Sequence, residues 1–140
     1  MNGHSTMWWA TTGAEVYSVD ISEQFIGLTL KICENFKNVH GVIQDGIAFL
    51  KSFEQPIDLL FLDAWDVIEG TPFAEKHLEA YLAARPQLHE NSLILIDDTD
   101  VQDCGKGRLV IPQAIKDGYK VVFSGRQTLL AKEKNDHMAS

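Results

Sequence analysis

Four short apolar runs in this chain each end on an acidic residue, and this pattern constrains the fold more than any other feature. The runs end at Asp20, Asp45, Asp63 and the pair Asp97 and Asp98. Short apolar runs rich in β-branched residues are typical of strands that are buried on both faces. The stretches between the runs are long enough for crossover helices, so we expect the strands to be parallel.

Parallel strands joined by crossover helices bring their carboxyl ends to one edge of the sheet, where open α/β folds bind ligands. We therefore expect the acidic residues to face a single shared crevice. Carboxylates in such a crevice suit ribose hydroxyls, amino groups, a sulfonium-bearing ligand or a divalent cation. Each acid also has a simpler reading, because Asp20 on its own could be a helix cap and Asp63 a turn residue.

The end of the chain predicts a different connection. Only residues 124–126 separate two strand-like segments, which is too little chain for a crossover, so these two strands are expected to pair antiparallel. The whole pattern predicts an α/β fold with a Rossmann-like, mostly parallel sheet, helices on both faces and a C-terminal antiparallel hairpin. Strands are expected at residues 15–19, 39–43, 57–62, 92–96, 119–123 and 127–131. We expect one domain over residues 1–132 and a polar tail over 133–140.

Composition limits the classes of partner. The formal net charge of −8 argues against a nucleic-acid or anionic-membrane surface. No apolar stretch is long enough to cross a bilayer, and the N-terminus lacks the pattern of a signal peptide. Two cysteines do not form a disulfide framework. We therefore expect a cytoplasmic protein that binds neither nucleic acid nor a membrane.

Four segments together resemble the class I S-adenosylmethionine-dependent methyltransferases, and among them the small-molecule O-methyltransferase branch that includes catechol O-methyltransferase. These segments are EVYSVDIS at residues 15–22, LLFLDAWD at 59–66, LILIDDTD at 93–100 and YKVVFSGRQTLLAK at 119–132. No single motif is decisive, but the ordered set is fairly specific and spans roughly residues 2–132. The resemblance implies methyl transfer from S-adenosylmethionine to a hydroxyl of a small molecule.

The resemblance also implies a set of cofactor-binding residues. The segment that includes Gly3, His4 and Ser5 is similar to the end of the family's glycine-rich first loop, which approaches the methionine part of the cofactor. Asp20 matches the acid that binds the two ribose hydroxyls, and Asp45 matches the acidic loop near the adenine amino group.

The same resemblance gives Asp63 a catalytic place near the methyl donor. In metal-dependent members, the corresponding acid joins an acidic pair on the next strand to hold magnesium or calcium, and Asp97 and Asp98 occupy that place. The ion would bind the acceptor oxygen and favour its deprotonated form. Adjacent side chains on a strand point to opposite faces, so both acids reach one ion only if the strand ends there.

Two departures from the family pattern stand out. Catechol O-methyltransferase has a basic lysine three residues beyond the first metal aspartate, where this chain has Asp66. Lys106, Arg108 and His77 are candidates to replace that lysine as the general base.

The second departure is that the chain contains no residues for the family's first strand. Three remedies are open: the neighbouring strands close up, a second chain supplies the strand in a homodimer, or residues 6–12 form a strand. The missing strand leaves a second function open, in which a catalytically inactive methyltransferase-like fold serves as an oligomeric or interaction module. Enzyme activity is therefore uncertain from the sequence.

Overall fold

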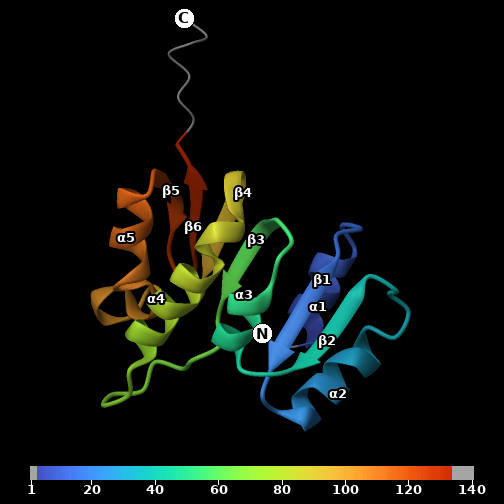
Figure 1. Ribbon diagram of the computed structural model, residues 1–140. Helices are drawn as coiled ribbons and strands as arrows, with labels where there is room; N and C mark the ends of the chain where they lie inside the picture. Colours follow the sequence, from blue (N-terminus) through green and yellow to red (C-terminus); the bar gives the residue numbers. More distant parts are fainter. Residues whose placement is uncertain (1–2, 134–140) are drawn as a thin grey trace, which may run out of the picture. The chain divides into compact units, whose positions relative to one another are not determined.

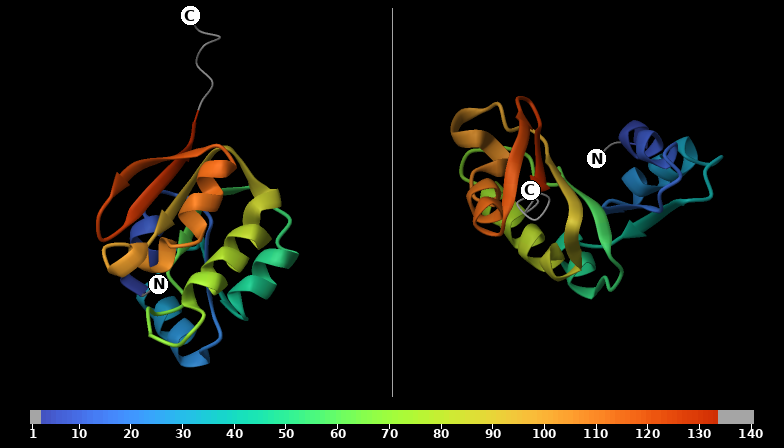
Figure 2. Two further views of the ribbon diagram at one scale, coloured as in Figure 1. Left: turned by 90° about the vertical axis from the view of Figure 1, so that its left-hand side faces the viewer. Right: turned by 90° about the horizontal axis from the view of Figure 1, so that it is seen from above.

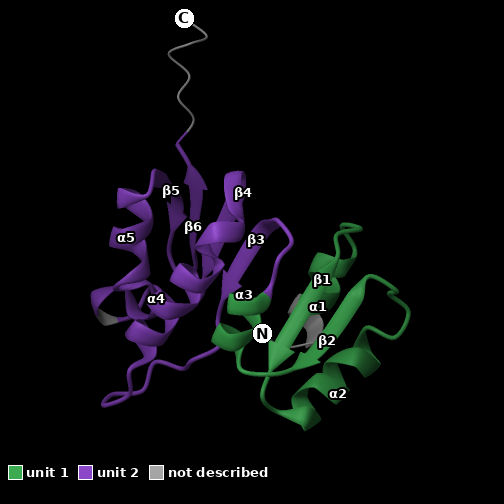
Figure 3. Cartoon of the chain, viewed as in Figure 1, with its two compact units in different colours: residues 1–52 green, residues 53–140 purple. Residues whose placement is uncertain are grey.

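The computed structural model of the chain describes residues 3–133, except for the side chains of residues 3–5 and 102 (Figure 1, Figure 2). The predicted polar tail from residue 134 onward lies outside the described residues. The chain divides into two compact units, residues 1–52 and residues 53–140 (Figure 3). Each unit is described by itself below, and the predicted single domain over residues 1–132 stays a prediction.

The first unit contains a two-stranded parallel sheet and three helices. Strands β1 (Val16–Asp20) and β2 (Val39–Ile43) pair along their whole length, from Val16 opposite Val39 to Asp20 opposite Ile43. Helices α1 (Gly3–Ala10) and α2 (Glu23–Ile32) contact this sheet and each other, and α3 (Gly46–Ser52) contacts β1. Ile26 on α2 is buried, and a Cβ atom on Gly41 of β2 would lie only 2.8 Å from its Cγ2, so the close packing of α2 on β2 requires glycine.

The segment proposed as an alternative strand, residues 6–12, is instead the end of α1 and the turn that follows it. The hydroxyls of Thr11 and Thr12 donate 2.6 Å hydrogen bonds to the carbonyls of Trp8 and Trp9, which satisfies carbonyl groups that the helix leaves unpaired at its end. Asn38 then donates to the carbonyls of Ala10 and Ala14 and holds the turn. The strand alternative for this segment is therefore wrong.

The second unit contains a four-stranded mixed sheet in the order β3-β4-β6-β5. Its strands are β3 (Ile57–Leu62), β4 (Leu88–Ile96), β5 (Tyr119–Ser124) and β6 (Thr128–Lys132). Helix α4 (Phe73–Ala84) contacts β3 and helix α5 (Val110–Lys116) contacts β5. Figure 2 shows α4 and α5 side by side on one face of this sheet. Two short 3-10 segments, η1 (Arg85–Gln87) and η2 (Gln102–Gly107), precede β4 and α5.

The pairing directions confirm the predicted fold class. β3 and β4 are parallel, whereas β6 pairs antiparallel with both β4 and β5. The core of the second unit lies between this sheet and the two helices, with Ile94, Ile96 and Leu130 fully buried. Every helix within residues 3–133 is too short or too polar to cross a membrane.

The described strands form two sheets, one in each unit, and the closing up of neighbouring strands into one sheet stays a prediction. β1 pairs only with β2, and β3 pairs only with β4, within the described part of the chain. No strand precedes Val16 among residues 3–133. The homodimer that would supply a further strand stays a prediction.

Candidate functional site

Two of the predicted acids lie together at the carboxyl edge of the first unit's sheet. Asp20 is the last residue of β1, and its pairing partner on β2 is Ile43, two residues before Asp45. Gln44 donates its backbone N–H to the Asp20 carbonyl at 3.0 Å, which continues the pairing beyond β2. The parallel pairing therefore places Asp20 and Asp45 at one edge, as the sequence predicted.

Both acids also cap the turns that follow them. Asp20 Oδ1 accepts a 2.8 Å hydrogen bond from the Ser22 backbone N–H, and Ser22 caps α2 by accepting from the Phe25 N–H. Asp45 Oδ2 accepts from the Ala48 N–H at 2.9 Å, at the start of α3. Each of these bonds uses one carboxylate oxygen, and an ionised carboxylate has about four acceptor sites, so the caps leave capacity for a ligand.

The structure places Gly3, His4 and Ser5 in the first turn of α1. The sequence analysis compared these residues with the last part of a glycine-rich loop, and that comparison stays a prediction. Their side chains lie outside the described part of the chain, so contact between Gly3, His4 or Ser5 and a cofactor stays a prediction.

The other three acids converge at the carboxyl edge of β3 and β4 in the second unit. Leu62 pairs with Ile96, and Asp63 and Asp97 are the residues that follow. β4 ends at Ile96, and Asp98 has a positive φ of 52°. Asp97 and Asp98 therefore lie beyond the strand, and their side chains need not point to opposite faces of the sheet. One carboxylate oxygen from each of Asp63, Asp97 and Asp98 lies within 4.8 Å of the others.

A lysine occupies the space among these acids. The Lys106 ammonium lies 2.8 Å from Asp63 Oδ1, 3.1 Å from Asp98 Oδ2 and 3.2 Å from the Asp63 backbone carbonyl. The Lys106 side chain is only 1% exposed, compared with 21% for Asp63 and 36% for Asp98. The buried ammonium therefore lies beneath two partly exposed carboxylates.

The ionisation of the cluster follows from this arrangement. Burial alone would raise the pKa of Asp63, but the hydrogen bond and positive charge of Lys106 outweigh it and lower that pKa. Burial would lower the pKa of Lys106, but its hydrogen bonds with Asp63 and Asp98 raise it overall. Burial, followed by a hydrogen bond to Asp63, raises the pKa of Asp97. Asp63 and Lys106 are thus an ion pair at neutral pH.

The loop that carries Lys106 has an unusual backbone. Asp98, Asp103 and Cys104 all have positive φ, and Gly105 has φ 48° and ψ −121°, a conformation open to glycine only. A Cβ atom on Gly105 would lie 2.1 Å from the Asp98 carbonyl oxygen. Gly105 thus packs directly against the backbone of Asp98, and the ammonium of the next residue, Lys106, contacts Asp63.

The other two candidates for a general base have their hydrogen-bond partners outside the acidic cluster. Arg108 donates to Glu75 at 3.2 Å and stacks over the Phe73 ring. His77 is fully buried, with Nδ1 2.6 Å from the Phe73 carbonyl, and Nε2 accepts a 3.5 Å hydrogen bond from the Trp65 N–H. Because both ring nitrogens of the neutral imidazole have backbone partners, His77 fixes the loop after Asp63 and does not serve as a general base.

This burial makes the stability of the fold depend on pH. Burial lowers the pKa of His77 to about 4, compared with 6.5 in an unfolded chain. Between these values the unfolded chain binds the proton first, so protonation favours unfolding. We expect neutral His77 to make its full contribution to the free energy of unfolding above pH 6.5. That free energy should fall by up to about 3 kcal/mol as the pH is lowered to 4.

Urea unfolding at several pH values checks this expectation, with His77→Gln as the comparison. The variant removes the titrating group, so its free energy of unfolding should depend less steeply on pH between 6.5 and 4. Equal slopes for the two proteins would show that His77 does not carry the effect.

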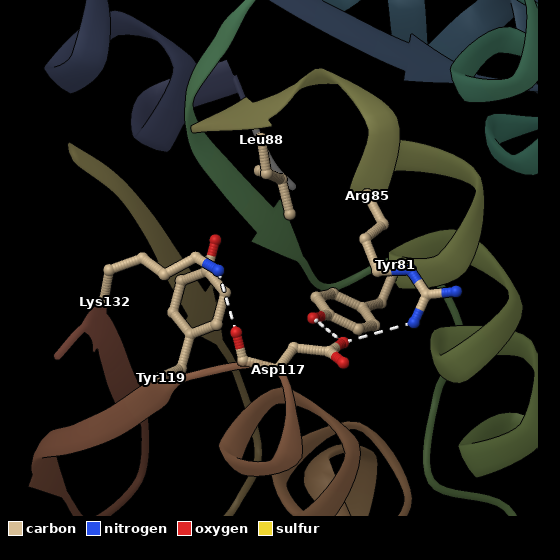
Figure 4. A pocket seen from close by; sticks show the side chains of 6 residues that line it. All are labelled: Tyr81, Arg85, Leu88, Asp117, Tyr119 and Lys132. Atoms are coloured by element: carbon tan, nitrogen blue, oxygen red, sulfur yellow. Dashed lines mark hydrogen bonds and ion pairs between the residues drawn. The ribbon is translucent and has the colours of Figure 1, made fainter. Parts of the chain in front are cut away.

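A cavity of about 350 Å³ lies at the opposite edge of the second unit's sheet, near the first residue of β4, Leu88 (Figure 4). Asp117 in this cavity accepts hydrogen bonds from Tyr81 at 2.5 Å and Arg85 at 3.3 Å. The Lys132 ammonium lies over the Tyr119 ring and donates to the Asp117 backbone carbonyl. None of the acids predicted from the sequence lines this cavity, and its charged groups bond mainly to each other.

The structure thus brings the predicted acids into two groups, one in each unit. The crevice shared by all of them stays a prediction, as do the roles assigned to each. The sequence named Lys106 only as a candidate general base and did not predict its contacts with Asp63 and Asp98. A lysine flanked by Gly105 and Gly107 in the loop after an acidic pair is the pattern that could have pointed to it.

Comparisons with known proteins show the family and the fold. Residues 1–99 match the family model described as a methyltransferase domain. A search of curated proteins found no match. The chain also resembles solved structures of methyltransferases at identities that show a common fold.

Three of these structures illustrate the likeness. An rRNA methylase from Streptococcus thermophilus is 15% identical, with a TM-score of 0.69 over 96% of this chain and 83% of that one. An O-methyltransferase from Bacillus cereus in complex with SAH is 17% identical, with a TM-score of 0.66 over 94% and 70%. The O-methyltransferase TomG from Streptomyces achromogenes in complex with SAM is 13% identical, with a TM-score of 0.68 over 95% and 70%. Because the family model covers most of the chain and the parallel strands end on acids where ligands bind such folds, the chain belongs to the methyltransferase domain family.

Proposed function

We propose that this protein transfers a methyl group from S-adenosylmethionine to a hydroxyl of a small molecule. The observation that supports this most is the presence of acids at the carboxyl edges of both parallel strand pairs, in a chain of the methyltransferase domain family. Similar folds in complex with SAM and SAH support the choice of cofactor.

The residues of the first unit fit the polar groups of this cofactor. Asp20 would accept hydrogen bonds from the two ribose hydroxyls, and Asp45 would accept from the adenine amino group. Each acid uses one oxygen to cap a turn and keeps acceptor capacity on its carboxylate.

The second unit would position the methyl acceptor. The bound cofactor supplies an electrophilic methyl group on its sulfonium, and the protein contributes mainly the alignment of donor and acceptor. Asp63 is partly exposed and is ionised at neutral pH because Lys106 lowers its pKa. We infer that Asp63 accepts a hydrogen bond from the acceptor hydroxyl.

A small molecule is a better acceptor than RNA for this chain. Several similar folds are rRNA methylases, which makes RNA the natural competitor. The net charge of −8 disfavours a polyanion, because binding phosphates requires clustered lysine or arginine side chains. An activity screen should therefore include both small hydroxylated aromatic compounds and RNA.

Calorimetric titration with S-adenosylhomocysteine tests the cofactor half of this function. We expect the wild-type chain to bind, and Asp20→Ala to bind roughly tenfold to a hundredfold more weakly, because charged hydrogen bonds are lost. Glu34→Ala is the matched control, since it removes an equally charged, exposed side chain from the same unit. No heat of binding, or equal affinity of wild type and Asp20→Ala, would contradict the proposal.

The acceptor screen then separates an enzyme from an inactive relative. Methylated product from a small hydroxyl compound, with none from RNA, is the expected result. Cofactor binding without product from any acceptor would instead favour the second function, an inactive fold that serves as an interaction module.

A further inference from the structure

We propose that Lys106 is the resident cation of the acidic cluster formed by Asp63, Asp97 and Asp98, and that it takes the place of a divalent metal ion. Metal-dependent relatives of catechol O-methyltransferase make a metal ion the obvious expectation for three acids at this edge. The contacts of Lys106 indicate instead that its ammonium neutralises the acids. This proposal does not depend on whether the protein transfers methyl groups.

The first argument is the hydrogen bonding of the ammonium. A lysine ammonium has three N–H donors, and Lys106 has three acceptors within reach: Asp63 Oδ1, the Asp63 carbonyl and Asp98 Oδ2. The side chain is 1% exposed and comes from a different segment of the chain, 43 residues after Asp63. The ammonium therefore has as many protein oxygens within reach as it has N–H donors.

The second argument is the space and charge available to a metal ion. Magnesium and calcium bind carboxylate oxygens at about 2.0–2.6 Å, so an ion bound to Asp63 and Asp98, even through the oxygens that Lys106 does not contact, would lie close to the ammonium. Two cations at such short separation repel strongly where water is excluded. A metal ion could enter only if Lys106 left, and the residues as they lie do not fit one.

The third argument is that the loop holds Lys106 in place. Gly105 lies against the Asp98 carbonyl so closely that a Cβ atom there would be 2.1 Å away, and Val101 also borders it. Arg108 donates its backbone N–H to the Gly105 carbonyl at 3.2 Å. These contacts keep the residue before Lys106 against the cluster, which favours the buried position of the ammonium.

Binding of Mn²⁺, Ca²⁺ and Mg²⁺ by calorimetry tests the proposal. We expect no binding of these ions at the cluster of the wild-type protein. Lys106→Ala removes the ammonium, opens space and leaves the acids, so we expect it to bind Mn²⁺ at least roughly tenfold more tightly than wild type. The double variant with Lys106→Ala and Asp98→Asn should lose this gain, which would locate the ion at the cluster.

Two outcomes would overturn the proposal. One is a folded Lys106→Ala protein that gains no affinity for any of the three ions. The other needs no Lys106 variant: wild-type protein that binds Mn²⁺ and loses that binding in Asp98→Asn would show that a metal ion and Lys106 coexist. Neither result depends on whether the chain binds S-adenosylhomocysteine, so a failure here is distinct from a failure of the proposed function.

Discussion

Replacing Asp63 with alanine is expected to lower the free energy of unfolding by about 3–5 kcal/mol. The Lys106 ammonium is buried and has two of its three acceptors on Asp63, the carboxylate and the backbone carbonyl. Alanine keeps the carbonyl but removes the carboxylate, so a buried positive charge loses its shortest ion pair. Removing one partner of a buried pair is costly because the other charge stays desolvated. Urea unfolding at neutral pH measures the change.

Asp66→Ala is the matched control for Asp63→Ala. Asp66 carries the same charge three residues later but is exposed, so its replacement should change the free energy of unfolding by less than about 0.5 kcal/mol. Asp63→Asn keeps an acceptor for Lys106 and should fall between the two. Equal stabilities of Asp63→Ala and Asp66→Ala would mean that Lys106 finds another partner, and would weaken the ion-pair description.

Replacing Gly105 with alanine is expected to destabilise the fold by more than about 2 kcal/mol, or to move the loop that carries Lys106. The added Cβ would lie 2.1 Å from the Asp98 carbonyl oxygen, which belongs to the backbone and cannot rotate away. The backbone angles of Gly105 also lie in a region that alanine avoids. Thermal unfolding would measure the loss of stability, and amide hydrogen exchange in residues 98–108 would detect a displaced loop.

Gly125→Ala provides the comparison, because a Cβ atom at Gly125 meets nothing within 4 Å. We expect this variant to be close to wild type in both measurements. If Gly105→Ala behaved in the same way as Gly125→Ala, the loop would tolerate a side chain at residue 105. The placement of Lys106 would then need a different explanation.

The acid positions were predictable because they follow from two local facts. Apolar runs rich in valine, isoleucine and leucine form buried strands, and parallel pairing places the ends of such strands at one edge. Asp20 and Asp45 meet this expectation in the first unit, and Asp63 and Asp97 meet it in the second. The antiparallel hairpin was equally predictable from the three residues between its strands.

Lys106 was not predictable by the same reasoning. Its position depends on the loop from Asp98 to Gly105, in which Asp98, Asp103, Cys104 and Gly105 have positive φ. A periodic sequence pattern does not predict the backbone of such a loop. The alternative strand at residues 6–12 was wrong for a different, local reason. Residues with some tolerance for β structure, such as Thr11 and Thr12, end the helix α1 because their hydroxyls hydrogen-bond to its last carbonyls.

The loop around Lys106 also contains an exposed cysteine that can be labelled. The chain has two cysteines, of which Cys33 is buried in the first unit and Cys104 is exposed, two residues from Lys106. Burial raises the pKa of the Cys33 thiol and makes it a poorer nucleophile at neutral pH. An alkylating fluorophore would therefore attach first at Cys104, so the natural sequence already permits a spectroscopic reporter beside the buried ammonium without an engineered thiol.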